Sequence, residues 1–586
     1  MRPQLAALRE EMARRKIDAY VVTSADAHAR DNAASFWHGR QWLSGFMGSA
    51  GLMVVTADSA GLWTDGRYFI QAETELNGSG IDLFREREPG VPSYTKFLAN
   101  CLPAGGKVGF DGRTVMVSQF KKLKTELTEK KISFAYDEDL LAEIWKDRPT
   151  KPTGKAFVHP LEFACAFAAE KLADVRKKMR AGGIDTYLVT SLESVAWLAN
   201  LRGSDVPNTP VVYAFALVTE DAAHLFVEPG KVEPEMVPDF EIHEYNEFPD
   251  FLKTCGKVHF NPQSTNVLLA DAIEKCAELA PNTDIVLNLK AQKSPGELAN
   301  IKNAYLREGV VLVKTFAWLA GEMAKGATIY EGDVVRFLQN LRSADENYLS
   351  DSFDTICAFM GNAAMVHYNC GEQGAKLEPG GFLLIDTGGQ YLDGTTDTTR
   401  TIWLAPDGNA ISPTMKRDFT LVLRGNMELG AAAFPIGTTG FALDILARRA
   451  MWEAGQNYLH GTGHGVGYCL GVHEGPQRIA QVASDVPLAP GMLISNEPGI
   501  YKQDRYGIRI ENILYVREKE TTPDGKFLCF ENLTLCPIDT RAVKLDLITP
   551  LERERLNDYH RKVYEALSPH LSPDERDWLK TATEPI

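Results

Sequence analysis

Apolar and polar residues follow a pattern that occurs twice in the first half of the chain. A basic amphipathic segment at residues 4–15 precedes the run Ile-Asp-Ala-Tyr-Val-Val-Thr-Ser at 17–24, and a similar segment at 170–181 precedes Ile-Asp-Thr-Tyr-Leu-Val-Thr-Ser at 184–191. Each run is followed by a second strand candidate, and these end alike in Val-Thr-Ala-Asp and Val-Thr-Glu-Asp. A helix followed by apolar, β-branched runs is typical of an α/β unit. The repeat therefore predicts two related domains in tandem. Chance similarity of two common strand patterns is the alternative.

A third region with a different pattern opens near residue 293. Ser294-Pro-Gly-Glu297 has the spacing of a capping box with proline in the first turn, which predicts the start of a helix, and Thr549-Pro-Leu-Glu552 predicts a closing helix in the same way. Between them, helix candidates alternate with strand–turn segments rich in Gly, Asp and Thr, an α+β pattern. A segment rich in Pro, Lys and Gly at 148–155 is the predicted link between the first two domains. The predicted domains are residues 1–155, 156–292 and 293–586.

Composition and charge narrow the functional classes. The chain is 44% hydrophobic and 24% charged, as in soluble globular proteins, and its formal net charge is −16. This charge argues against a nucleic-acid partner, because a phosphate backbone requires a basic face. The nine cysteines are scattered without a CxxC pair, which favours a reducing compartment over a disulfide framework. We find neither an apolar leader nor an uncharged apolar stretch of about 18 residues, so we expect a cytoplasmic protein with no membrane partner.

The first chemical signal is a pair of aspartates. The apolar run 382–385 ends in Asp386, a glycine turn follows, and a threonine-rich segment contains Asp397. The spacing suits two carboxylates on neighbouring strands of a hairpin that point toward one place. A surface hairpin whose Asp and Thr residues merely cap turns is the alternative. Because Asp386 lies at the end of an apolar strand, its carboxylate is expected to be buried and to need a partner or a metal ion.

The second signal is a segment rich in glycine and histidine, with His460, His464 and His473 close together. Its glycines let backbones approach closely. A phosphate-binding GxGxxG motif fails because position 466 is valine, and an HExxH motif fails because Gly-Pro follows His473-Glu474. A buried core histidine is the usual alternative, although three of the twelve histidines within one short segment make it a poor one.

The third signal is a pair of isolated acids, Glu497 and Glu511. In the segment Ile508-Arg-Ile-Glu511, strand alternation places Arg509 and Glu511 on one face and the isoleucines on the other. A solvated polar face is the alternative. Together the three signals give four carboxylates and one imidazole, a hard, oxygen-rich set that favours Mn²⁺, or Co²⁺ and Fe²⁺, over a structural zinc. Four negative charges match two divalent cations, whose field would acidify a bridging water for hydrolysis of an amide.

These residues resemble the creatinase/aminopeptidase family with the pita-bread fold, and within it the three-domain, cytosolic Xaa-Pro aminopeptidases (aminopeptidase P). The resemblance extends to Ser24-Ala-Asp-Ala-His28, Gly45-Phe-Met-Gly-Ser-Ala-Gly51 and Trp63-Thr-Asp-Gly-Arg-Tyr68 near the start, and to Phe530-Glu-Asn-Leu-Thr-Leu-Cys-Pro537 near the end. It implies a fold of mixed α/β and α+β class, in which two tandem creatinase-like N-terminal domains precede a C-terminal pita-bread catalytic domain.

The resemblance also implies roles for individual residues. Asp386 would bind one metal ion, His464 and Glu497 the other, and Asp397 and Glu511 would lie between them. His367 and His473 would act on the substrate side, and Glu497 would accept the proton of the attacking water. Arg67, His460 and Arg509 would help to bind the peptide.

The implied reaction is removal of the first residue from peptides with proline at position 2, by a metal-bridged hydroxide that attacks the scissile carbonyl. Two divalent ions, Mn²⁺ first and Co²⁺ or Zn²⁺ as alternatives, and a homodimer are part of the expectation. A prolidase restricted to Xaa-Pro dipeptides and a catalytically silent pita-bread module that binds proteins are the rival interpretations. The doubled N-terminal half argues against the first, and retention of all five candidate ligands argues against the second.

Overall fold

The computed structural model describes residues 2–586 apart from 31, 253–254, 276, 282–283 and 406–409. The chain divides into two compact units, residues 1–286 and 287–586. Residues 148–155 form neither helix nor strand, as expected of a link, while the predicted domain limits at 155 and 292 stay predictions.

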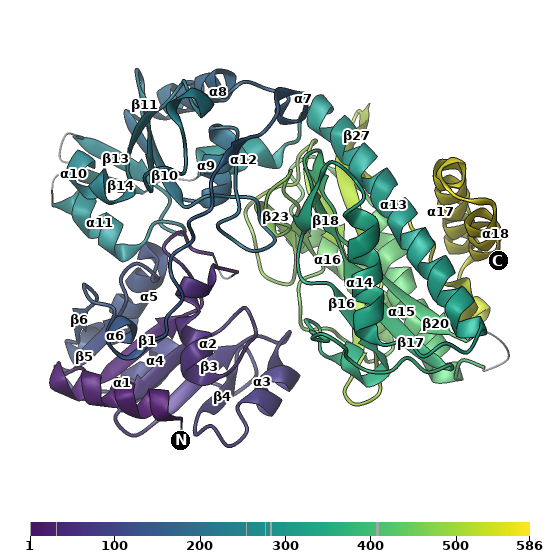
Figure 1. The fold of residues 1–586 in the computed structure, drawn as a ribbon, viewed down its shortest axis with the longest axis horizontal. Coiled ribbons are helices and arrows are strands. Elements are labelled where there is room, and N and C mark those ends of the chain that lie inside the picture. The colour runs from purple at the N-terminus through teal and green to yellow at the C-terminus, as the bar shows by residue number, and fades with distance from the viewer. Residues whose placement is uncertain (1, 31, 253–254, 276, 282–283, 406–409) are drawn as a thin grey trace. The chain divides into compact units, whose positions relative to one another are not determined.

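The first half of unit 1 is a six-stranded sheet with helices packed against it (Figure 1). The strand order is β4-β3-β2-β1-β5-β6, with β1 antiparallel to β2 and parallel to β5. The strands are β1 (Ala19–Thr23), β2 (Leu52–Thr56), β3 (Ala60–Thr64), β4 (Asp82–Arg85), β5 (Lys107–Phe110) and β6 (Ser133–Ala135). The helices are α1 (Pro3–Arg14), α2 (Gly39–Ser44), α3 (Phe69–Glu75), α4 (Tyr94–Cys101), α5 (Val117–Leu127) and α6 (Leu140–Ile144).

The second half of unit 1 repeats this topology. Its sheet has the order β12-β11-β10-β8-β13-β14, again with an antiparallel and a parallel neighbour beside the central strand. The strands are β8 (Thr186–Val189), β10 (Ala214–Thr219), β11 (Ala223–Val227), β12 (Glu241–Glu244), β13 (Lys257–Phe260) and β14 (Glu278–Pro281). Two short strands, β7 (Phe157–Val158) and β9 (Leu201–Arg202), pair separately. The helices are α7 (Leu161–Ala164), α8 (Ala168–Gly182), α9 (Leu192–Leu198), α10 (Phe248–Phe251) and α11 (Val267–Glu274), and α12 (Ile285–Ala291) runs across the limit between the two units.

The sequence repeat thus has a structural basis. Its two strand-like runs form β1 and β8, which occupy equivalent central positions in the two sheets, and the two basic amphipathic segments form α1 and α8. In each helix the leucine, valine and methionine positions are buried and most charged positions face outward, with Glu11 and Lys171 as buried exceptions.

Unit 2 has a long helix, α13, as its first large element (Figure 1). The Ser294 side chain accepts from the Glu297 backbone N–H and the Glu297 carboxylate accepts from the Ser294 backbone N–H, as the sequence predicts, and Thr549 and Glu552 cap α17 in the same way. Helix α13 packs against α14, α17 and α18, and α15 packs against α16. The helices are α13 (Pro295–Ala324), α14 (Glu331–Arg342), α15 (Pro413–Gly430), α16 (Gly440–Glu453), α17 (Pro550–Leu567) and α18 (Pro573–Ala582).

The strands of unit 2 form several small sheets, which place the candidate residues. One sheet has the order β16-β17-β20, another β21-β28-β27-β24, and a third β15-β18-β19, while β22 pairs with β23 and β25 with β26. The strands are β15 (Tyr348–Asp351), β16 (Ile356–Phe359), β17 (Gly381–Thr387), β18 (Gly389–Tyr391), β19 (Gly394–Thr395), β20 (Thr398–Leu404), β21 (Ala433–Pro435), β22 (Gly463–Gly465), β23 (Glu474–Ile479), β24 (Leu493–Asn496), β25 (Gly499–Lys502), β26 (Tyr506–Arg509), β27 (Asn512–Thr522) and β28 (Gly525–Asn532).

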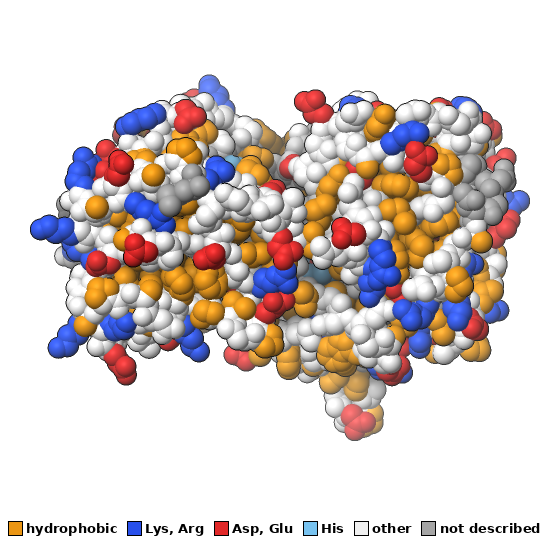
Figure 2. Space-filling model, turned by 90° about the horizontal axis from the view of Figure 1, so that it is seen from below, with side chains coloured by type: hydrophobic (Ala, Val, Ile, Leu, Met, Phe, Trp, Pro, Cys, Tyr) orange, Lys and Arg blue, Asp and Glu red, His pale blue; other side chains and the backbone are white. Residues whose placement is uncertain are grey.

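Two predictions, on the cysteines and on membrane-spanning segments, can be compared with the structure. The eight described cysteines are all free thiols, as their scattered spacing predicts, and Cys276 lies outside the described residues. Among the described residues, none of the helices combines the length and apolarity needed to cross a bilayer. On the face drawn in Figure 2, basic and acidic side chains are interspersed.

Candidate metal centre

Asp386 and Asp397 lie on neighbouring strands, although not in a simple hairpin. Asp386 ends the apolar run of β17, which pairs with β20 so that Asp386 lies opposite Thr399, and Asp397 directly precedes β20. The chain between them forms β18 and β19, which belong to a separate sheet in which β18 pairs with both β15 and β19. Both carboxylates are buried, with 8% and 4% of their residue surfaces exposed.

His464 reaches the same place from β22 because its glycine neighbours allow close packing. A Cβ on Gly463 would lie 1.9 Å from the Ser495 carbonyl oxygen, and one on Gly465 would lie 2.3 Å from that of Glu474. The imidazole Nδ1 donates to the Gly465 carbonyl at 2.8 Å. In the neutral imidazole the lone pair is therefore on Nε2, which lies 3.6 Å from Asp397 Oδ2 and 3.5 Å from Glu497 Oε1. This is the orientation in which histidine binds a metal ion.

Glu511 and Arg509 approach the aspartates from one side, as strand alternation predicts. The Thr399 hydroxyl donates to Glu511 Oε2 at 2.7 Å and accepts from Arg509 Nε at 3.1 Å. The single strand expected here is interrupted, since β26 ends at Arg509 and β27, in another sheet, begins at Asn512. Both side chains nevertheless contact the same threonine on β20.

The carboxylates form a dense cluster of negative charge. One ligand atom each from Asp397, His464 and Glu511 lie within 4.8 Å of one another. Burial, followed by repulsion from Glu511, Asp386 and Glu497, raises the pKa of Asp397 well above its ordinary range. Burial and the charges of Glu497 and Asp386 raise the pKa of Glu511 to about 8. Such a cluster needs added positive charge to stay ionised at neutral pH.

Asp386 has one carboxylate oxygen that the surrounding described residues do not satisfy. Its Oδ2 accepts from Arg509 Nη2 at 2.5 Å, but its buried Oδ1 has no hydrogen-bond partner among the residues that the structure describes. A buried carboxylate oxygen without a partner is costly, and a cation beside it removes that cost. The donor set, four carboxylates and one imidazole, fits two divalent ions of the oxygen-preferring kind.

Arg509 links the cluster to two more candidates. Its Nη1 donates to the Tyr501 hydroxyl at 2.9 Å, and that hydroxyl lies 2.8 Å from His460 Nε2. Its Nη2 also donates to the Val366 carbonyl at 3.5 Å, which holds the residue before His367 near Asp386. His460 and Arg509 are both buried and are joined through Tyr501, while their role in binding a peptide stays a prediction.

His473 stands on the open side of the cluster. Its side chain is exposed, and its ring lies 4.4 Å from the ring of His464 in an edge-on arrangement. The next residue, Glu474, is fully enclosed and pairs with Lys290 Nζ and, at 2.6 Å, with Lys293 Nζ. Burial alone would raise the pKa of Glu474, but the two lysines hold it below its ordinary value. His473 therefore projects from an anchored segment.

Arg67 is the one candidate outside unit 2. It lies just before α3 in unit 1, where its guanidinium pairs with Asp65 at 2.6 Å. Its role toward the peptide stays a prediction. The remaining nine candidates all belong to unit 2.

Several residues that support the cluster are absent from the sequence-based prediction. Tyr501 and Thr399 connect Arg509 to His460 and Glu511, and Glu331 accepts from the backbone of Phe359 and Ala375 and from the Tyr368 hydroxyl beside His367. Tyr501 lies four residues after Glu497, a proximity that could have drawn attention to it. Glu331 lies on α14, far from any motif, so the sequence carries no local signal for it.

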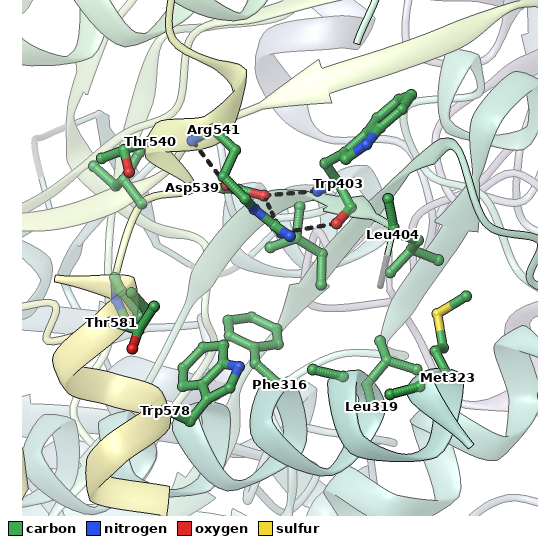
Figure 3. A pocket seen from close by; sticks show the side chains of 17 residues that line it. Phe316, Leu319, Met323, Trp403, Leu404, Asp539, Thr540, Arg541, Trp578 and Thr581 are labelled. Carbon is green, nitrogen blue, oxygen red and sulfur yellow. Dashed lines mark hydrogen bonds and ion pairs between the residues drawn. The ribbon is translucent and has the colours of Figure 1, made fainter. Parts of the chain in front are cut away.

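A separate cavity of about 350 Å³ lies elsewhere in unit 2 (Figure 3). Phe316, Leu319 and Met323 of α13, Trp403 and Leu404 of β20 and Trp578 of α18 form its apolar walls. Arg541 at its edge is paired with Asp539 and the Trp403 carbonyl. None of the candidate site residues lines this cavity.

Comparisons with known proteins place the chain in a family. Metallopeptidase family M24 matches residues 299–518, and the C-terminal region of these peptidases matches 526–586. The creatinase/prolidase N-terminal domain matches twice, at 4–140 and 147–297. Aminopeptidase P2 of Arabidopsis thaliana is 38% identical over 97% of this chain and 86% of its own length. The chain belongs to the Xaa-Pro aminopeptidase family of metallopeptidases.

Further relatives agree with this family. A probable Xaa-Pro aminopeptidase P of Neosartorya fischeri is 37% identical over 100% of this chain and 92% of its own length. The crystal structure of an X-prolyl aminopeptidase from Caenorhabditis elegans, described as a cytosolic enzyme with a di-nuclear active site, matches with a TM-score of 0.94 and 32% identity over 100% of this chain and 99% of that one. An Xaa-Pro dipeptidase from Bacillus anthracis matches with a TM-score of 0.50 and 26% identity over 64% of this chain and 99% of its own.

These matches confirm the predicted family and the predicted hydrolase class. They also confirm the predicted fold class, two creatinase-like N-terminal domains followed by a pita-bread catalytic domain. The B. anthracis dipeptidase aligns with 64% of this chain, whereas the C. elegans aminopeptidase aligns with 100% of it. The second N-terminal domain is thus a feature shared with the aminopeptidase structure.

Proposed function

We propose that this protein is a metal-dependent aminopeptidase that releases the N-terminal residue from peptides with proline in second position. The observation that carries the proposal is the convergence of Asp397, His464 and Glu511 on one point. It occurs in a chain whose full length matches Xaa-Pro aminopeptidases.

Two divalent cations would be held by Asp386, Asp397, His464, Glu497 and Glu511. When bound, such ions polarise a carbonyl oxygen and lower the pKa of water. The di-nuclear site of the C. elegans enzyme supports the number of ions. Manganese is the proposed ion because four of the five ligands are carboxylates, and Co²⁺ and Zn²⁺ are the alternatives.

The side chains around the cluster would then move and place protons. Glu497 would accept the proton of the attacking water, because its carboxylate lies beside the His464 imidazole on the less buried side of the cluster. His473, exposed and next to His464, would donate toward the departing proline nitrogen. His367, on the segment that Arg509 holds, would hydrogen-bond the developing oxyanion.

Arg509 would act as the positioning group of the site. Its guanidinium holds Asp386, Tyr501 and the carbonyl beside His367 at once, which only a planar group with several donors can do. His460, bonded to Tyr501, would line the place where the peptide lies. Arg67 of unit 1 would contact the peptide as well.

A comparison of peptide lengths tests the reaction. An Xaa-Pro-Xaa tripeptide and a longer peptide with proline second should be cleaved after the first residue, and a matched peptide with alanine second should not. Cleavage confined to the Xaa-Pro dipeptide would instead establish the prolidase. An absence of hydrolysis with any added metal would favour the silent binding module.

The homodimer and the cytosolic location also belong to this proposal. Helix α16 exposes Phe441, Ile445 and Trp452, whose spacing places them on one face, and each is at least 41% exposed. A large apolar stripe of this kind favours a protein partner, and a second copy of the chain would cover it symmetrically. The location is supported by the C. elegans relative, which is described as cytosolic.

A further inference from the structure

Three side chains with metal-binding chemistry converge in unit 1, in a sheet that contains none of the candidate active-site residues. His224 belongs to β11, and Glu241 and His243 belong to β12. The parallel register places His224 opposite Glu241 and Phe226 opposite His243. Because side chains alternate along a strand, the residues at 224, 226, 241 and 243 share one face of the sheet.

The donor atoms of this cluster are close enough for one ion. His224 Nδ1 lies 3.2 Å from His243 Nε2 and 3.3 Å from Glu241 Oε2, and ligand atoms of all three residues lie within 4.8 Å of one another. Donor atoms around a tetrahedral zinc ion, each about 2.0–2.2 Å from the metal, are separated by distances of this order.

The two rings are fixed by aromatic neighbours. His243 stacks on Phe226 with ring centroids 5.0 Å apart and planes 21° apart, and His224 packs 4.4 Å from the ring of Phe251. The Glu241 side chain, in contrast, is 67% exposed. The imidazoles are thus preoriented while one side stays open to water, the arrangement of a site with three protein ligands and a solvent ligand.

A histidine pair that simply hydrogen-bonds is the plain alternative. It accounts for the contact between His224 and His243, and the His224 Nδ1–H can also be shared with the Glu241 carboxylate, so zinc binding has to separate the two interpretations. A cation that accepts lone pairs from all three groups accounts for both contacts.

We propose that His224, Glu241 and His243 bind a third divalent cation of the zinc class. Two imidazoles and one carboxylate suit Zn²⁺, whereas the carboxylate-rich cluster of unit 2 suits Mn²⁺. The two sites therefore prefer different metals. The cation would fasten β12, a four-residue edge strand, to β11.

Zinc binding to the manganese-loaded, full-length protein tests this site. Zinc bound at equilibrium is measured by elemental analysis after dialysis against buffered Zn²⁺ for wild type, Glu241→Gln and His243→Gln. The wild type should bind one more zinc per chain than either variant at low zinc, and the variants should bind it at least about tenfold more weakly. Because Glu241 is exposed, Glu241→Gln keeps the fold even where His243→Gln does not.

His259→Gln is the matched control, since His259 lies on β13 of the same sheet but outside the cluster. It should bind zinc as wild type does. Hydrogen exchange should slow at residues 223–227 and 241–244 when zinc is added to wild type, and not in Glu241→Gln. Equal zinc content and affinity in wild type and Glu241→Gln, or no extra zinc in the wild type, would overturn the site.

Discussion

Three of the five candidate ligands at the metal centre have a neighbour that fixes them in place. Gly465 O orients His464, Thr399 holds Glu511, and Arg509 holds Asp386. Asp386 Oδ1 has no hydrogen-bond partner among the residues that the structure describes, and the lone pair of His464 Nε2 lies beside the carboxylates of Asp397 and Glu497. These atoms all offer electron pairs, so the cluster favours bound cations over further protein contacts.

Replacing Glu511 with glutamine tests this assignment at the level of one residue. Glu511→Gln keeps the size of the side chain and the acceptor for Thr399 but removes the charge. We expect turnover to fall by more than about 100-fold and bound Mn²⁺ to decrease, measured by peptide assay and elemental analysis.

Glu518→Gln is the control for this change because Glu518 lies on the adjoining strand β27 with an exposed side chain. It should leave turnover and metal content unchanged. Full activity and metal content in Glu511→Gln would contradict the ligand assignment.

Sequence patterns drew attention to the acidic residues and histidines that come together in the cluster of unit 2, but not to the residues that connect them. Asp386 stands out because a carboxylate follows an apolar strand, and His464 stands out among glycines. Thr399 and Glu331 are common residue types at unremarkable positions, and their roles arise only from contacts between distant segments. Those contacts are set by tertiary packing, which local patterns do not encode.

At the scale of strands and helices, close packing at glycines and the pairing of strands explain where the metal centre lies. Glycines let β22 pass close to β24 and β23, and a Cβ on Gly507 would lie 1.8 Å from the Ala363 carbonyl oxygen. Alternation and capping signals predicted helices α13 and α17 and the shared side of Arg509 and Glu511. They did not predict that β18 and β19 separate Asp386 from Asp397, because the pairing of β18 with β15 depends on a segment distant in the sequence.

The segment that carries His473 depends on a buried charge pair. Lys290→Met leaves buried Glu474 with one lysine. We expect a loss of stability of up to about 3 kcal/mol, since the buried carboxylate is then only partly compensated. Turnover should fall as well, because Glu474 adjoins His473. Chemical denaturation and kinetic assays measure the two effects.

Lys302→Met provides the comparison for Lys290→Met, since Lys302 pairs with Glu531 at an exposed position. It should change stability by less than about 1 kcal/mol and leave turnover intact. If both variants behave alike, the buried pair does not anchor the segment.

At the scale of the molecule, the charge cluster links metal binding to stability. Burial and neighbouring carboxylates raise the pKa of Glu511 from 4.5 to about 8 in the metal-free protein. A raised pKa means that the folded state favours the protonated acid. The contribution of Glu511 to the free energy of unfolding is therefore present in full below pH 4.5 and is lost as pH rises toward 8. The rise in melting temperature on adding Mn²⁺ should therefore be larger at pH 8 than at pH 5.

Thermal melts of Glu511→Gln across the same pH range provide the control. Without the titrating carboxylate, the metal-free variant should lose less stability between pH 5 and pH 8 than wild type. The same pH dependence in both proteins would show that Glu511 is not the group responsible.

The exposed stripe of α16 predicts how copies of the chain associate. Trp452→Glu would place a charge in an apolar contact, and we expect it to convert a dimer to a monomer in sedimentation experiments. Leu551→Glu, at an exposed apolar position on α17, should leave the dimer intact. A monomeric wild type at micromolar concentration would contradict the predicted homodimer.

The most direct measurement of the central claim is a titration of metal-stripped protein with Mn²⁺, with bound metal and cleavage of an Xaa-Pro-Xaa peptide recorded together. Activity should be absent without metal and should rise until two ions are bound per chain at the unit 2 site. Release of the first residue should require proline in second position, and Co²⁺ and Zn²⁺ should be compared in parallel. Full activity of the metal-free protein, or saturation of activity with no metal bound, would contradict the account.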